Sequence, residues 1–166
     1  MKSILTFTLL ITVIFTATAE EKAFVTSRSM SAETANMLAI TSLRACQKQG
    51  YQVSAAVVDR NGTLLAFIRD PLAGNHSISV ATRKAYTAAT FQTATISMMQ
   101  QKSFDALRYA DKVLLIGGGV PVRIGGHFYG AVGISGAPAK KITGDVDHAC
   151  GEKGIEAIRE LIEFSE

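Results

Sequence analysis

The chain has 166 residues, of which 48% are hydrophobic and 19% are charged, with 17 Lys and Arg against 14 Asp and Glu. This length is typical of a single domain that buries an adequate core without metals or multiple disulfides. The basic residues are scattered along the chain, so the small positive charge predicts no nucleic-acid partner.

Residues 1–19 have the features of a cleavable signal peptide. Lys2 gives a positive start, residues 4–15 are almost wholly apolar, and Ala17 and Ala19 are the small residues that precede a cleavage site. The apolar run is shorter than the roughly 18 residues that a retained membrane anchor needs. We therefore expect a periplasmic or secreted protein whose single domain is residues 20–166, with no membrane span after cleavage.

The expected helices and strands follow from hydrophobic periodicity and from turn residues. In chain order they are a helix over 31–49, a hairpin of strands 51–58 and 63–69, a helix over 77–92, strands 113–116, 120–124 and 128–135, and a helix over 145–164. The segment 93–111 is weakly patterned and is expected to be irregular or a short helix.

The helix over 77–92 has mostly small inward candidates, Ile78 and four alanines, which let a helix lie close to a sheet. Arg83 and Lys84 are expected on its outward side. Because hairpins rather than crossovers join most neighbouring strands, the order of elements predicts an α/β (α+β) domain with an antiparallel sheet of about five strands and packed helices.

The two cysteines, Cys46 and Cys150, fall on the inward faces of the first and last helices. In an oxidising compartment they form either a disulfide or two small buried thiols. A disulfide requires the two helices to be neighbours, with Cα atoms no more than about 7 Å apart.

The glycine run 117–119 looks like a phosphate-binding loop, but Val120 and Pro121 follow it where the N-terminus of a helix would be needed. The run instead favours positive φ angles, or a close approach by a ligand or another backbone segment. The sequence also has no Gly-x-Ser-x-Gly or His-Glu-x-x-His motif, so hydrolase chemistry has no visible centre.

Three histidines are candidate ligands. His76 precedes the start of a helix, where an imidazole and free N–H groups suit a metal porphyrin and its propionates, although a solvated loop histidine fits equally well. His127 follows a hairpin turn and shares a strand face with Tyr129 and Ala131 if the alternation holds. His148 lies beside acidic residues of the last helix, which are ordinary complements of a helix dipole.

Four blocks together resemble the GlcG/HbpS family of haem-binding proteins, which is DUF336-like and related to the PduO C-terminal domain. The blocks are residues 57–62 (VVDRNG), 83–88 (RKAYTA), 117–123 (GGGVPVR) and 130–136 (GAVGISG). They fall in the family's order and span nearly the whole mature chain, so together they are more specific than any one block.

The resemblance implies a profilin-like domain, a homo-oligomer, and binding of haem or a related tetrapyrrole, with secreted members linked to haem and iron sensing. We therefore expect an exported haem-binding protein that acts in sequestration, delivery or sensing. The alternatives are a haem-degrading enzyme and a binding or signalling module for another small ligand.

The resemblance implies haem as the ligand but no fixed axial ligand, so the iron ligand is chosen by its chemistry and location. His76 is the first candidate for the haem iron, on its chemistry and location, and His127 is the second. Arg83 or Lys84 would pair with a propionate. Gly118 and Gly119, from the glycine block that matches the family, complete the candidate cofactor site.

Overall fold

The computed structural model describes residues 23–165, so the expected signal peptide lies outside the described residues. Within that part of the chain, no helix is both long and apolar enough to cross a membrane. The elements in chain order are α1 (Ala32–Gln47), β1 (Ser54–Val58), β2 (Leu64–Arg69), α2 (Ser77–Phe91), α3 (Thr95–Met99), the 3-10 helix η1 (Lys102–Tyr109), β3 (Gly119–Ile124), β4 (His127–Ser135) and α4 (Asp145–Glu163).

The four strands form one antiparallel sheet in the order β2-β1-β4-β3. The mixed α/β architecture is as predicted, but the expected strand over 113–116 is absent from the described chain. Val113 and Leu115 bury their side chains in a small cluster with Met98, and the Leu114 N–H bonds to the side chain of Thr87 instead of a strand. The sheet therefore has four strands.

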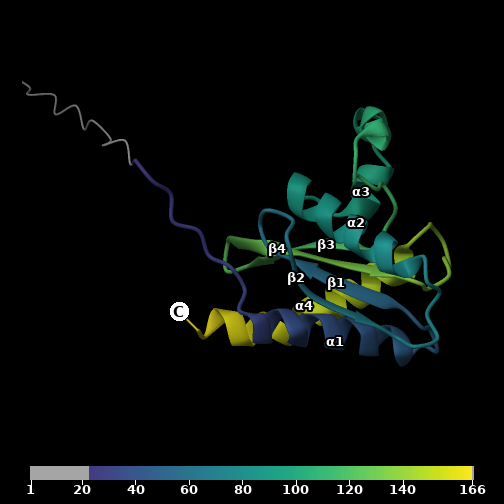
Figure 1. Cartoon of the computed structure of the whole chain (residues 1–166), viewed down its shortest axis with the longest axis horizontal. Helices are drawn as coiled ribbons and strands as arrows, with labels where there is room; N and C mark the ends of the chain where they lie inside the picture. The colour runs from purple at the N-terminus through teal and green to yellow at the C-terminus, as the bar shows by residue number, and fades with distance from the viewer. Residues whose placement is uncertain (1–22, 166) are drawn as a thin grey trace, which may run out of the picture.

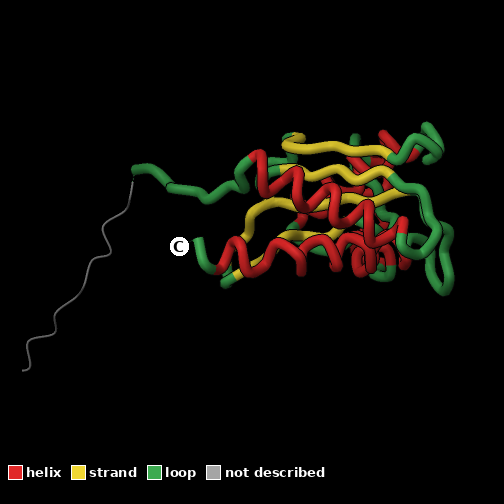
Figure 2. The backbone as a smooth tube through the Cα atoms, turned by 90° about the horizontal axis from the view of Figure 1, so that it is seen from below, coloured by secondary structure: helices red, strands yellow, loops and turns green. Residues whose placement is uncertain are grey.

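The sheet is the middle of three layers, with α2 and α3 on one face and α1 and α4 on the other (Figure 1). Seen from below, α1 and α4 run side by side across the strands (Figure 2). The larger core cluster fills the α1 and α4 side, and the cluster under α2 is built mainly from alanines. At Gly133 a Cβ atom would lie 2.1 Å from the carbonyl oxygen of Ala81, so this close packing of α2 on β4 requires glycine.

A bulge interrupts the alternation of side chains along β4. The register with β3 shifts between Val122 and Arg123, and Gly130 adopts a φ of 136°. As a result Tyr129 packs on the α1 and α4 side while Ala131 packs against α2. The prediction that His127 and Tyr129 share a face is confirmed by the contact of their rings, but the placement of Ala131 on the same face is wrong.

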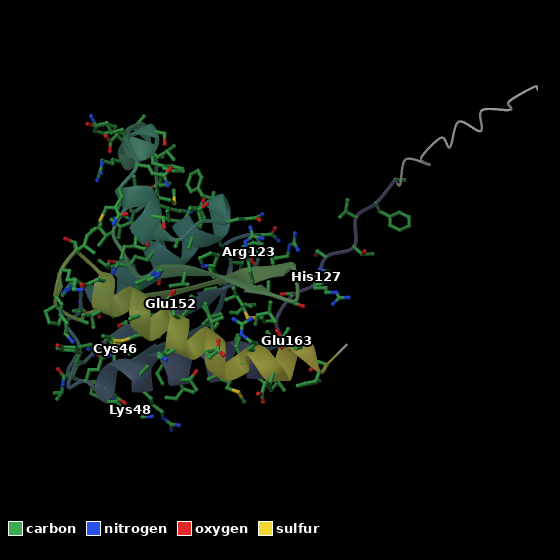
Figure 3. All side chains as sticks on the ribbon, turned by 180° about the vertical axis from the view of Figure 1, so that it is seen from behind. Cys46, Lys48, Arg123, His127, Glu152 and Glu163 are labelled. Carbon is green, nitrogen blue, oxygen red and sulfur yellow. A yellow bond between two sulfur atoms is a disulfide. The ribbon has the colours of Figure 1, made fainter. Side chains whose placement is uncertain are left out.

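The disulfide between Cys46 and Cys150 is present. The Cα atoms are 5.5 Å apart, within the limit set from sequence, and both side chains are fully buried. Cys46 lies near the end of α1 and Cys150 near the start of α4, so the bond joins two antiparallel neighbours (Figure 3).

Replacing both cysteines with alanine should lower the free energy of unfolding by about 2–5 kcal/mol, because the bond closes a long loop of the unfolded chain. Urea denaturation followed by circular dichroism measures this loss. Wild-type protein under strong reductant should show a similar loss. An unchanged denaturation midpoint in both samples would show that the disulfide contributes nothing to stability.

Candidate functional site

Helix α2 carries the run RKAYTA (residues 83–88), and its two sides have different roles. Lys84 shares the buried stripe of Ala81, Ala85 and Ala88 and is only 2% exposed. Its Nζ donates to the Asp147 carboxylate at 2.8 Å and to the Ile134 carbonyl at 2.9 Å. The predicted outward position of Lys84 is therefore wrong, and its ammonium is already engaged inside the fold.

The predicted site glycines pack around this buried lysine. A Cβ atom at Gly118, whose φ is 118°, would lie 2.6 Å from the Ile134 carbonyl oxygen and 2.9 Å from Lys84 Nζ. A Cβ atom at Gly119 would lie 2.3 Å from the Lys84 carbonyl oxygen. Both glycines are buried, so their small size serves the approach of one backbone segment to another.

Lys84 and Asp147 form an ion pair whose side chains are 2% and 4% exposed. Burial lowers the pKa of Lys84 and raises the pKa of Asp147, since leaving water penalises each charge, while their mutual attraction opposes both shifts. Each charge also has a backbone partner. The Lys84 ammonium donates to the Ile134 carbonyl, and the Asp147 carboxylate accepts from the Ala137 N–H. The pair links α2 to α4 beside the C-terminal end of β4, where Lys84 also donates to Ile134.

Breaking this pair from one side should destabilise the protein strongly. Lys84→Met leaves a buried carboxylate unpaired and should cost about 3–5 kcal/mol of unfolding free energy. Lys84→Met combined with Asp147→Asn should cost clearly less than the sum of the single changes. A double-mutant cycle by urea denaturation measures the difference, and additive losses would contradict a coupled pair.

Asp145 organises the start of α4. Its carboxylate accepts N–H bonds from Lys140, Lys141 and Val146 at 2.7–3.0 Å, next to Gly144, which has no side chain to cap the helix. These bonds, with the one from Lys140 first, hold the pKa of Asp145 at about 2. At the start of α4, Asp145 thus binds backbone N–H groups, and Asp147 pairs with Lys84.

Because the folded state lowers the pKa of Asp145, its contribution to stability is present above the ordinary value and lost as pH falls. The difference in unfolding stability between wild type and Asp145→Asn should persist at neutral pH and shrink as the pH falls from 3.8 to about 2. Urea denaturation across this pH range measures it. A difference that does not vary with pH would contradict the assignment.

The outward side of α2 borders a groove of about 550 Å³ beside the turn between β1 and β2. It is lined by Asn61, Gly62, Thr63, Ile78, Ser79, Thr82, Arg83, Tyr86 and Lys112. The predicted inward position of Ile78 is wrong, since its side chain is 39% exposed here. Helix α2 packs over β1, β4 and β3, which leaves its side toward the edge strand β2 open.

His76 stands just before the groove, at the N-cap of α2. It is exposed, its ring packs against Gly74, and its ring makes no hydrogen bond within the described part of the chain. His76 precedes Ser79 by three residues and Arg83 by seven, which places all three on one stripe of the helix. A rise of 1.5 Å per residue separates His76 from Arg83 by about 10 Å along the axis.

Two cations stand along this groove. The Arg83 guanidinium donates to the Val113 carbonyl at 2.9 Å, which fixes its position, and it retains further N–H donors. Lys112 is exposed and has a positive φ of 62° in the turn before Val113. The groove thus combines a free imidazole at its approach, an aromatic and an aliphatic side chain, and two cations.

The other predicted ligand, His127, lies elsewhere. It is exposed at the hairpin end of β4 (Figure 3), and its ring meets Tyr129 with centroids 6.4 Å apart. Tyr129 belongs to the α1 and α4 side of the sheet, opposite α2. The structure therefore brings together His76 and Arg83, but not His127, Lys84, Gly118 or Gly119.

Of the residues that line the groove, sequence reasoning named only Arg83 as a site residue, and it missed Tyr86, Ile78 and Lys112 among others. Tyr86 follows Arg83 by three residues and Ser79 by seven, so helical spacing could have found it. Its ring packs on Gly62, where a Cβ atom would lie 2.8 Å from Tyr86 Cδ2. Ile78 was assigned to the wrong face, and Lys112 lies next to a weakly patterned segment that carries no signal.

Comparison with known proteins identifies the class. The sequence model described as "Haem degrading protein HbpS-like" matches residues 30–156, which is most of the chain. The chain therefore belongs to the HbpS-like family. A curated relative, the uncharacterized 15.0 kDa protein in the dhaT-dhaS intergenic region of Citrobacter freundii, is 29% identical over 112 residues, covering 64% of this chain and 75% of the relative.

Solved structures agree with this family and fold. A double mutant of Streptomyces reticuli HbpS is 30% identical, with a TM-score of 0.75, and the match covers 88% of this chain and 98% of that one. A structure of a PduOC:haem complex is 27% identical, with a TM-score of 0.66, covering 79% of this chain and 96% of that one. The second relative was thus crystallised with haem.

Proposed function

We propose that this chain is an exported haem-binding protein that holds the porphyrin along the outward side of α2. It acts in sequestration, delivery or sensing of haem or iron. Membership of the HbpS-like family and the likeness to a PduOC:haem complex support haem as the ligand.

The observation that carries the proposal is that His76, Arg83 and Lys112 lie along the same side of α2. His76 offers an imidazole nitrogen to iron. Arg83 and Lys112 offer charged donors to propionates, for which guanidinium groups are suited by bidentate geometry. Ile78, between His76 and Arg83, and Tyr86, one turn beyond Arg83, offer apolar surface to the macrocycle, so the residues present fit the group.

Export is supported by two features. Residues 1–19 have the composition of a signal peptide. The disulfide between Cys46 and Cys150 is of the kind that persists in oxidising compartments. A periplasmic or secreted location follows as part of the proposal.

A homo-oligomer is also part of the proposal. The groove has one helical wall, and Ile78 and Leu64 near its edges are 39% and 49% exposed. The short β1–β2 turn faces this helix, so burial of most of a flat macrocycle needs a further surface. Another copy of the chain placed against this side would provide it.

A haemin titration followed by absorbance tests the function. Wild type should give a saturable Soret shift, and His76→Ala should bind at least about tenfold more weakly, a loss of about 1.4 kcal/mol. His127→Ala is the matched control, because it removes an exposed imidazole that does not line the groove, and it should bind like wild type. Arg83→Gln should weaken binding while retaining the Soret position set by the axial ligand.

Thermal unfolding of each variant should show that it remains folded. Absence of any shift in wild type, under conditions where a known haem binder responds, would refute haem binding. A shift lost in His127→Ala but kept in His76→Ala would refute the placement along α2. With a reductant and oxygen, the bound spectrum should persist; bleaching with release of iron would favour the haem-degrading alternative.

A further inference from the structure

A second groove lies on the opposite face of the molecule, between α1 and α4, with a volume of about 540 Å³. It is lined by Thr41, Arg44, Ala45, Lys48, Gln49, Lys153 and Ala157. Three of these side chains are cationic, and no carboxylate lines the groove. The haem proposal uses none of these residues.

The three cations have no anionic partner within the described part of the chain. Arg44, Lys48 and Lys153 are exposed and take part in no ion pair there. The nearby acids of α4 are directed elsewhere, since Glu152 and Glu156 line the side of α4 toward β3. Like charges around one cavity therefore stand uncompensated.

The dipole of α1 explains only part of this pattern. Arg44 lies in the last turn of α1 and Lys48 is its C-cap residue, where cations complement the helix C-terminus. Lys153 lies in the interior of α4, eight residues after its start, and it belongs to a different helix. Neither helix dipole explains why Lys153 lines the same groove as Arg44 and Lys48.

The walls of this groove are held rigidly. The disulfide joins the two helices beside Lys48, whose position near Cys46 is visible in Figure 3. One turn further, Gly154 lets α4 approach Ser42 and Leu38 so closely that a Cβ atom would lie 3.1 Å from a Leu38 methyl carbon. The helix backbones that carry the three cations are therefore held in fixed positions, which reduces the entropy lost on binding.

We propose that the α1–α4 groove binds a small multivalent phosphate-bearing anion. A single charge can be close to only some of the three cations, whereas linked phosphate groups can contact donors from both helices at once. Arginine and lysine both bind phosphate oxygens by charge-assisted hydrogen bonds. Gln49 at the rim already donates its side-chain amide to the Ala45 carbonyl and to the Cys150 sulfur, so the anion would be bound by the three cations.

Isothermal titration with sodium tripolyphosphate tests this site on the purified protein. Wild type should bind one equivalent at low ionic strength, and the affinity should fall as salt is raised to about 0.15 M, because screening shortens the reach of exposed charges. Lys48→Gln combined with Lys153→Gln should weaken binding at least tenfold. Acetate, with one charge, should give no saturable heat.

The matched control is Lys102→Gln combined with Lys141→Gln, which removes the same charge from exposed positions outside the groove. It should bind tripolyphosphate like wild type. Equal losses in the two double variants would reduce the effect to net charge and overturn the site, as would the absence of binding to wild type. Haemin binding should be unchanged in both, so failure of this proposal is distinguishable from failure of the haem proposal.

Discussion

The fold depends on a charge pair that lies inside it. Lys84 extends from α2 past β4 to Asp147 at the start of α4, so one contact spans all three layers. Two charges removed from water are tolerated only with short distances and further hydrogen bonds, and backbone groups of Ile134 and Ala137 supply these. The surrounding segments must therefore approach closely, which is why Gly118 and Gly119 are needed there.

The contact of Lys84 with Asp147 fixes the inward side of α2, and the outward side borders the groove. Because the buried stripe of the helix is fixed by alanine packing and by Lys84, the stripe with Arg83 and Tyr86 is presented in a defined orientation beside the β1–β2 turn. In the proposed function this surface binds haem, and the free imidazole of His76 is the proposed donor to the iron. The two cationic regions lie on opposite faces of the sheet and are structurally independent.

The sequence predicted most of the fold because periodicity and turn residues are local signals. Helix and strand bounds agree within a few residues, and the paired cysteines lie on neighbouring helices as required. The apolar run 113–116 was misassigned, since a short buried run has no period to separate strand from loop. Lys84 was placed outside because lysine is rarely buried without a partner, and its partner lies 63 residues away. Spacing alone could not reveal that pairing.

The contact between Tyr86 and Gly62 joins the two walls of the proposed haem groove. One wall of the groove is a helix locked to the core, but the facing wall is a hairpin turn, with Gly62 at a φ of 82° against the Tyr86 ring. Turns on the surface change length and composition among related proteins at little cost to the core. If the proposed function holds, changes in residues 59–63 alone would therefore alter the shape of the macrocycle that the groove accepts, without disturbing the buried ion pair behind α2.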